Sequence, residues 1–367
     1  SLFAGLSGQA LAALNNFWQA FPSLKQQLFS VNSEGYSHIA TDNIQQTISD
    51  NEDVKHFTQQ YNSAFDSFES FIESNLIEPM MSLNVQKTQT TISDDLFHRL
   101  ENFPLVDRYQ AFQFFSYDWD KIAADLEILQ TEGFQAVKQI DPRMVEKNKE
   151  EVQDGWMGHV LPFELVQEML LQDDVQVIRD MEMRMEELTS QFNEIIDSMT
   201  PEEKDKPILS DDNSHFVATE VKKELKRILT KISTPEIELL RSFPSKKNEK
   251  EQFIANHPEL AWNAVEPDKN GKYGKTQVNA MIRYYQENFA FDEDSLEAKV
   301  KVVAAMLEEE KSLLADAAQK RRELVDKTIA TIQSLDDDTA IELLRCKWVR
   351  PLLASLQRMP SEVITTL

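Results

Sequence analysis

The sequence is poor in the residues that build disulfide frameworks, phosphate-binding loops and membrane spans. It contains 1 cysteine and 8 glycines in 367 residues, and no apolar run is long enough to cross a bilayer. The single cysteine, Cys346, excludes an internal disulfide and is typical of a protein in a reducing compartment. We therefore expect a cytoplasmic protein without a membrane partner. Because the chain begins with Ser1 rather than Met, we also expect it to be processed or truncated.

The sequence also lacks recognisable catalytic motifs. It has no GxSxG, HExxH, CxxC or EF-hand pattern and no Gly-rich strand-to-helix loop for a nucleotide or S-adenosylmethionine. The Asn-Pro-Pro-aromatic loop that holds a flipped adenine in amino-methyltransferases is missing as well. The 6 histidines are scattered, with no pair at metal-ligand spacing. We therefore expect no catalytic, cofactor-binding or metal-ligating residue in this chain.

What the chain has in excess is acidic charge and helix-forming residues. Its 63 Asp and Glu against 38 Lys and Arg give a net charge of −25. Long runs rich in Glu, Lys, Leu, Ala and Gln favour helix. Such a surface repels DNA phosphates on average. Solubility is the simplest interpretation of this charge, and a basic partner subunit or mimicry of DNA are the alternatives.

Two long helices are predicted over 162–199 and 292–335. In the second, apolar residues recur at intervals of three, four and seven without an intervening Pro or Gly, and Ser295 is placed to cap the first turn. A helix of roughly 40 residues is about 60 Å long and needs a partner along most of its length. The Met- and Ile-rich stripe of 162–199 makes that helix the natural partner, packed antiparallel. The predicted seam consists of Ile178, Met181, Met185, Leu188, Phe192, Ile195, Val300, Val303, Leu307, Leu314, Val325 and Ile329.

The predicted fold is mostly α: a helical bundle with a long antiparallel coiled-coil arm and little or no β structure. Short strands are only weakly indicated, near 136–140 and 157–161. The expected domains are, in chain order, an N-terminal helical domain over 1–131, a polar connector over 132–161, the arm over 162–335 with an inserted tip at 200–291, and a C-terminal helical segment over 336–367.

A basic helix face in the predicted tip interrupts the acidic surface. The helix is expected over 215–232, and its cations are Lys222, Lys223, Lys226, Arg227 and Lys231. A solvated face balanced by Glu220 and Glu224 is the favoured interpretation. Contact with DNA phosphates is the alternative.

Four stretches, in order along the chain, resemble the large modification subunits of type I restriction-modification systems. Residues 105–113, LVDRYQAFQ, continue to Trp119 and look like the L-x-D-x-Y-x-x-Y-Q…Y-W…D-D segment of that family. Residues 158–162, GHVLP, are similar to its G-x-L-I-P-K entry into a coiled arm. Residues 268–272, DKNGK, followed by Lys275, resemble its D-x-x-G-K-V-x-K turn, and Lys347-Trp348 matches its K-W pair.

The order and spacing of these stretches carry the resemblance, since no single one is specific. The chain departs from the family pattern at Phe112, Asp118 and Leu126, where Tyr, Tyr and Asp are usual. Cys346 stands where an acid is common.

The resemblance implies a non-catalytic C-terminal part of a DNA N6-adenine methyltransferase subunit, with the S-adenosylmethionine-dependent catalytic domain lying upstream. It implies assembly with a specificity subunit, contact with or clamping of DNA through the assembled complex, and in some assemblies a restriction subunit. A free-standing acidic helical scaffold or DNA mimic is the main alternative hypothesis. A hydrolase with an unrecognised site is a third.

Overall fold

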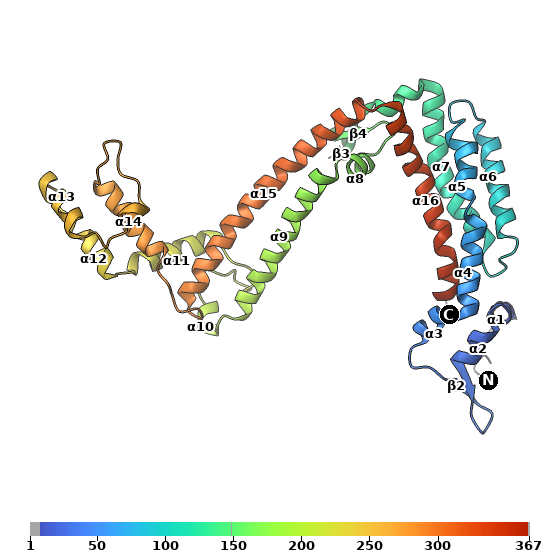
Figure 1. Ribbon diagram of the computed structural model, residues 1–367, viewed down its shortest axis with the longest axis horizontal. Coiled ribbons are helices and arrows are strands. Elements are labelled where there is room, and N and C mark those ends of the chain that lie inside the picture. Colours follow the sequence, from blue (N-terminus) through green and yellow to red (C-terminus); the bar gives the residue numbers. More distant parts are fainter. Residues whose placement is uncertain (1–7, 148, 366–367) are drawn as a thin grey trace. The chain divides into compact units, whose positions relative to one another are not determined.

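The computed structural model describes residues 8–147 and 149–365, and 69% of the structure is helical. The prediction of a mostly α fold with little β structure is confirmed: the strands found in the described residues form two small antiparallel sheets, β1–β2 and β3–β4. The chain divides into two compact units. Unit 1 comprises Ser1–Gln172 and Leu324–Leu367, and unit 2 comprises Asp173–Glu323 (Figure 1).

The first part of unit 1 is a small helical cluster with its own core. It contains α1 (Gly8–Ala20), α2 (Pro22–Leu28), β1 (Phe29–Val31), β2 (Ser37–Ile39) and α3 (Ile44–Asp50). Phe17, Phe21 and Leu24 are buried together. Pro22 occupies the first turn of α2, where the N–H that proline lacks would have no partner within the helix.

The main core of unit 1 is a bundle built around two long helices, α7 (Arg108–Glu132) and α16 (Asp337–Thr365). The other members are α4 (Glu52–Phe65), α5 (Phe68–Ile72), a π-helical turn (Glu73–Ile77) and α6 (Val85–Leu100). The Asp107 side chain accepts hydrogen bonds from the first backbone N–H groups of α7 and so fixes where the helix begins. Trp119 of α7 is buried in this core, and the Tyr61 hydroxyl of α4 donates to the Leu356 carbonyl of α16 at 2.9 Å.

Between α7 and the next helix lies a β-hairpin where the sequence only weakly indicated strands. A short 3₁₀ helix (Phe134–Lys138) leads into β3 (Ile140–Lys147), which pairs with β4 (Glu150–Gly158). The expected strand positions, 136–140 and 157–161, are therefore wrong. The hairpin escaped detection because most of its side chains are polar and exposed, so the apolar alternation of a half-buried strand is missing.

The predicted helix over 162–199 is two helices, α8 (Phe163–Leu170) and α9 (Gln172–Asp197). The break falls at Leu171, whose backbone leaves the helical region at φ −126° and ψ 35°. The predicted helix over 292–335 is α15 (Leu296–Gln333), whose first turn is capped by the Ser295 hydroxyl, which accepts from the Ala298 N–H at 3.2 Å.

The remaining elements of unit 2 are short helices between α9 and α15. They are α10 (Pro201–Lys204), α11 (Ala218–Lys231), α12 (Pro235–Arg241), α13 (Lys247–Asn256), a 3₁₀ turn (Trp262–Ala264) and α14 (Lys275–Glu287). Prolines begin α10 and α12, and a glycine, Gly274, precedes α14. These residues divide the segment into short helices, whereas α9 and α15 run uninterrupted.

Candidate functional site

Within unit 2, α9 and α15 lie side by side and antiparallel (Figure 1). Three contacts between the helices establish the direction. Glu182 binds Arg321 at 2.5 Å, Arg184 binds Glu309 at 2.7 Å, and the Ser198 carbonyl accepts from Lys299 at 3.1 Å. Residue numbers rise along one helix as they fall along the other. This is the geometry that the two stripes predict.

The residues of the predicted seam differ in their burial. Ile178, Leu188, Val300 and Val303 are buried. Other predicted positions are half-buried: Met181, Met185, Phe192, Ile195, Leu307, Val325 and Ile329. The last two belong to the part of α15 in unit 1.

Leu314 is a correction to the predicted seam, because its side chain is 55% exposed. Three residues later Ala317 is fully buried, and Leu313 is half-buried. Leu313 and Ala317 are four residues apart and share one face of the helix, whereas Leu314 lies about 100° around the helix from Leu313. The seam continues through Leu313 and Ala317 instead.

The arm, defined here as α9 with the unit 2 part of α15, leaves apolar side chains uncovered. Met183 is 51% exposed and Val302 is 50% exposed, and the half-buried Met181 and Met185 lie on the same helix as Met183. Two helices alone enclose only a narrow core. Flexible methionine side chains suit a surface on which another helix can pack.

The basic face of α11 is largely neutralised by neighbouring acids. Lys222 pairs with Glu308 of α15, Lys223 with Glu220, and Arg227 with Glu224. The hydrogen bond from Arg227 lowers the pKa of Glu224, and that from Lys222 lowers the pKa of Glu308. Within the described residues, the two other predicted phosphate contacts, Lys226 and Lys231, form no ion pair. On the opposite face, Val221 and Ile228 are buried with Val300 and Val303 of α15.

Residues 235–287 form a separate module within unit 2, with an aromatic core that the stripe analysis did not anticipate. The Trp262 ring lies 6.3 Å from that of Phe243, 6.5 Å from that of Phe253 and 5.0 Å from that of Tyr273. The Trp262 indole N–H donates to the His257 carbonyl at 2.7 Å, and the Tyr273 hydroxyl donates to the Trp262 carbonyl at 2.8 Å. This core joins α12, α13 and α14 into one module, named here the α12–α14 module.

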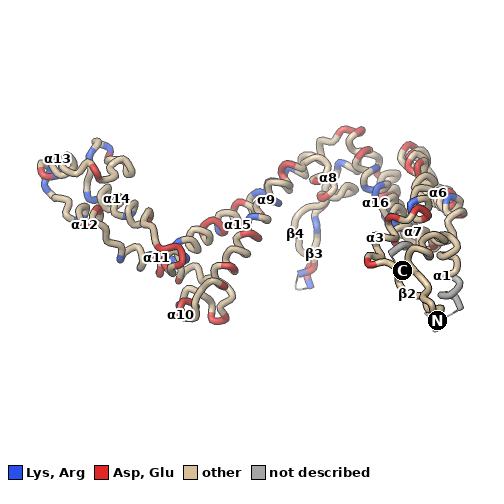
Figure 2. The backbone as a smooth tube through the Cα atoms, turned by 60° about the horizontal axis from the view of Figure 1, so that its bottom comes forward, with Lys and Arg blue, Asp and Glu red and all other residues tan. Residues whose placement is uncertain are grey.

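Charge is unevenly distributed between this region and the rest of the chain. Residues 217–291 contain 13 Lys and Arg against 10 Asp and Glu, whereas all other residues together contain 25 against 53. In Figure 2 the blue of Lys and Arg recurs over α13 and the loop before α14. Lys269, Lys272 and Lys275 were not among the predicted phosphate contacts. A count of charge by segment would have singled them out.

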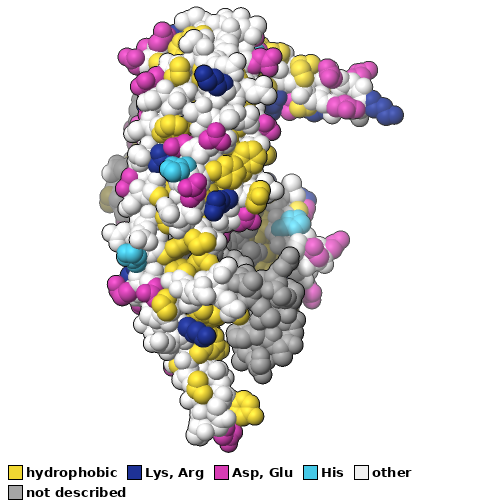
Figure 3. Space-filling model, turned by 90° about the vertical axis from the view of Figure 1, so that its right-hand side faces the viewer, with side chains coloured by type: hydrophobic (Ala, Val, Ile, Leu, Met, Phe, Trp, Pro, Cys, Tyr) yellow, Lys and Arg dark blue, Asp and Glu magenta, His cyan; other side chains and the backbone are white. Residues whose placement is uncertain are grey.

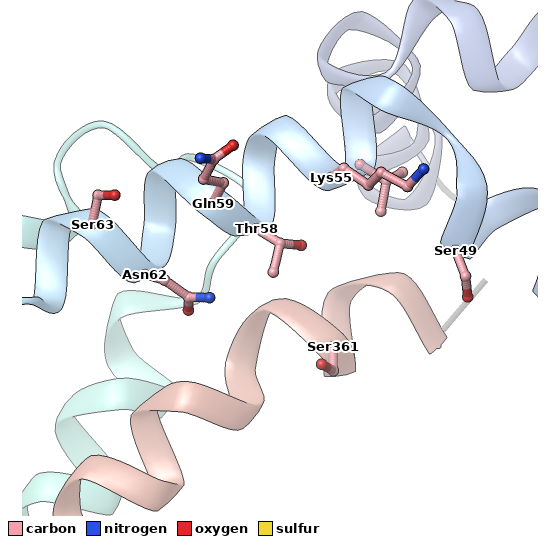
Figure 4. A pocket seen from close by; sticks show the side chains of 8 residues that line it. Ser49, Lys55, Thr58, Gln59, Asn62, Ser63 and Ser361 are labelled. Carbon is pink, nitrogen blue, oxygen red and sulfur yellow. The ribbon is translucent and has the colours of Figure 1, made fainter.

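On the face of the molecule drawn in Figure 3, acidic, basic and hydrophobic side chains are interspersed. Several open hollows lie in unit 1. One of about 620 Å³ lies between α4 and α16, and its lining includes hydroxyl and amide side chains, among them Thr58, Asn62 and Ser361 (Figure 4).

In the described part of the chain, no group of three or more His, Cys, Asp and Glu is arranged to hold a metal, and no helix is long and apolar enough to span a membrane.

A second hollow, of about 610 Å³, lies at the foot of the β3–β4 hairpin. His159 holds this foot in place: its Nδ1 lies 2.6 Å from Asp141 of β3, and its Nε2 lies 3.3 Å from Glu132 of α7. The hydrogen bond to Asp141 is the main cause of the raised pKa of His159. Gly158 is required here, because an added Cβ would lie 1.9 Å from the Leu161 carbonyl oxygen.

Three of the four stretches that carry the family resemblance meet beside this hollow. The Asp125 carboxylate of α7 accepts from the Trp348 indole N–H at 2.7 Å and pairs with Lys347 at 2.6 Å. Lys347 also donates to the Val160 carbonyl at 2.5 Å. The side chains involved hold the bundle together, and Cys346 beside them is buried, which raises its thiol pKa.

No protein-family model, curated protein or solved structure matches this chain. The resemblance therefore depends on the four stretches, of which the one over 268–275 lies in unit 2 and the others lie in unit 1.

Proposed function

We propose that this chain is a non-catalytic assembly module of a type I DNA N6-adenine methylase, in which the arm of unit 2 binds a specificity subunit. S-adenosylmethionine would be bound by a catalytic domain elsewhere in the assembly. The observation that carries the proposal is the antiparallel pair of α9 and α15, whose apolar seam is only partly covered by the pair itself.

The physical argument is the free energy available from covering the arm. Full burial of a Val or Met side chain contributes about 1.5–3 kcal/mol. Met183 and Val302 are each about half exposed, so a packed helix from a partner could gain part of this amount at each position. Long helices of a partner, laid along α9 and α15, would complete a bundle of the four-helix type.

The contacts of Asp125 with Lys347 and Trp348 support the family resemblance. They connect stretches that lie more than two hundred residues apart in the sequence. A buried carboxylate that accepts from two donors fixes the packing of α7 on α16. The residues that carry the resemblance thus have a structural role that does not require a catalytic site in this chain.

The arrangement of acids gives less support to a DNA mimic. A mimic presents an array of unpaired acids in place of phosphates. On the arm, Glu182, Glu308, Glu309 and Glu323 all pair with Lys or Arg of the same unit. Their charge is therefore partly neutralised within the protein.

The proposal is tested by the variant Met183→Asp/Val302→Asp, measured for binding to a specificity subunit of a type I restriction-modification system. Both side chains are half exposed, so the arm should still fold. Loss of two apolar contacts should weaken binding more than tenfold, since about 1.4 kcal/mol corresponds to a factor of ten.

Gln191→Asp/Ala305→Asp is the matched control. Its two exposed positions lie on the same helices and receive the same added charge, but less apolar surface is lost. Calorimetry should give the control a dissociation constant close to that of the unaltered chain. Equal affinities for the control and for Met183→Asp/Val302→Asp would refute the assigned role of the arm.

A further inference from the structure

We propose that one face of the β3–β4 hairpin in unit 1 binds a basic amphipathic helix of a protein partner. This face, named here the Trp156 face, consists of Pro142, Met144 and Trp156, followed toward the hairpin tip by Glu146 and Glu151. It belongs to a different unit from the arm, and the inference does not rest on the proposed function.

The strand register places the apolar side chains of the Trp156 face next to one another. Pro142 lies directly opposite Trp156, and Met144 lies directly opposite Gln153. Residues two apart along a strand share a face, and directly opposite residues have Cβ atoms about 4.5–5.5 Å apart. Met144 is 49% exposed, Trp156 is 46% exposed, and Pro142 is exposed as well. Three neighbouring apolar side chains thus form one exposed patch.

The acids of the Trp156 face have no cation beside them. Glu146 and Glu151 lie directly opposite each other, an arrangement of like charges that destabilises a strand pair. Within the described residues, neither forms an ion pair. On the other face of the hairpin, by contrast, Asp154 pairs with Arg143 at 3.5 Å and with Lys147 at 3.2 Å. The Trp156 face is therefore the one with charge left for a partner to neutralise.

The hairpin has unfilled capacity for packing. Every residue of β4 except Gly158 is exposed, and the hairpin projects from the helices of unit 1 (Figure 2). A two-stranded hairpin is marginally stable unless a further strand or a helix packs on it. A further strand is disfavoured at both edges, because Pro142 of β3 has no N–H to donate and a bulge interrupts the register between Pro142 and Met144. A helix laid on the face is the remaining way to cover it.

The spacing of the Trp156 face matches that of an α-helix aligned with the strands. The rows of Trp156, Met144 and Glu146 are two residues apart, or about 6.6 Å from one row to the next. In a helix, residues i and i+4 are separated by about 6 Å along the axis. A helix with apolar residues at i and i+4 and Lys or Arg at i+8 would therefore cover Trp156 and Met144 and place its cation over the two glutamates.

The charge of the Trp156 face selects this partner over two others. A nucleic acid would bring phosphates to Glu146 and Glu151, which repel them. A second copy of the same face has no Lys or Arg to offer, since its other residues are Ile140, Pro142, Met144, Gln153, Trp156 and Gly158. A cation from a different protein is required.

The test is anisotropy of a fluorescein-labelled helical peptide of about 16 residues, titrated with the full chain. The peptide has an Ala and Gln background, Leu at i and i+4, and Lys at i+8. Its isomer carries the Lys at i+6, about 200° around the helix, and has the same composition and charge. The unaltered chain should bind the first peptide more tightly than the isomer, which separates docking from general attraction to an acidic protein.

Two variants test the two parts of the face. Met144→Thr/Trp156→Thr should weaken binding of the first peptide by about tenfold or more. Glu146→Gln/Glu151→Gln should weaken it by about twofold to fivefold, the range of exposed ion pairs. The second variant should also slow amide hydrogen exchange in the hairpin, because the like charges are gone. Weaker binding by a more stable hairpin is a result that a purely structural role would not give.

The matched control is Val145→Thr/Val152→Thr, in which two directly opposite residues of the other face are replaced by side chains of nearly the same shape. It should bind the peptide like the unaltered chain. The proposal is overturned if neither peptide binds, if both bind equally, or if the control and Met144→Thr/Trp156→Thr bind equally. Self-association of the chain that Met144→Thr/Trp156→Thr abolishes would assign the face to a second copy instead. None of these measurements involves the arm, so the two proposals fail separately.

Discussion

Removal of the Asp125 carboxylate should destabilise unit 1 by more than any surface substitution. Asp125 is 8% exposed and binds Trp348, which is 2% exposed, and Lys347. In Asp125→Ala the buried indole N–H loses its acceptor, at a cost of about 1–3 kcal/mol. Loss of the ionic partner of a largely buried cation adds to this, and breaking buried pairs costs roughly 3–5 kcal/mol in total. We expect a loss of about 4 kcal/mol.

The variant Asp125→Asn removes the charge of this side chain but keeps nearly the same shape. The amide retains one oxygen that can accept from Trp348, while Lys347 faces a neutral amide instead of an anion. Hydrogen bonds to charged groups contribute about 1.5–3 kcal/mol and neutral ones about 0.5–1.5 kcal/mol, so this variant should lose about 1–2 kcal/mol. The free energy of unfolding should therefore decrease from the unaltered chain to Asp125→Asn and then to Asp125→Ala.

The assay is urea unfolding followed by tryptophan fluorescence in a Trp262→Phe background, so that the signal comes from unit 1. Asp120→Ala, an exposed acid on the same helix, is the control and should lie within about 0.5 kcal/mol of the unaltered chain. If Asp125→Ala were no more destabilising than this control, the network would not hold α7 and α16 together. The structural explanation of the family resemblance would then fail.

Three further outcomes are expected. Gly158→Ala should destabilise the hairpin foot by about 1–3 kcal/mol in urea unfolding, because the Leu161 carbonyl must move, and an unchanged midpoint would contradict the close approach. Ala317→Leu should lower the melting temperature of unit 2 by overpacking a fully buried site, whereas Leu314→Ala should change it little. If Leu314→Ala lowered the melting temperature more than Ala317→Leu, the seam predicted from the sequence, with Leu314 in it, would be correct. The raised pKa of His159 means that its stabilisation is fully present below the unfolded-state pKa of about 6.5 and is lost as pH rises through the higher folded-state pKa. The stability difference between the unaltered chain and His159→Gln should shrink over that rise, and a difference independent of pH would exclude the charged contact.

The parts of the fold that the sequence predicts correctly are those in which one face is continuously buried. Along α7, Phe115, Trp119 and Ile122 recur at helical spacing and are all buried. On α9 and α15, the spacing of Ile178, Leu188, Val300 and Val303 gives both the helices and their mutual packing. Burial of a single face imposes the helical period on the sequence, so that the period can be detected there.

The errors fall where other interactions determine the structure. The β3–β4 hairpin depends on backbone pairing and on contacts such as that of Arg143 with the Asp154 carbonyl, which leave no apolar pattern. The break at Leu171 follows an uninterrupted helical pattern and has no Pro or Gly to mark it. The aromatic core of the α12–α14 module joins rings from separate short helices, so no single stripe contains them.

Binding of a partner to the arm should change little with salt, because burial of apolar surface is not screened. The exposed pair Glu182–Arg321 contributes at most about 1 kcal/mol. The partner contact of the arm should therefore survive a fourfold rise in salt concentration. A steep loss of affinity with salt would show that charged groups, and not the half-exposed Met183 and Val302, carry the binding.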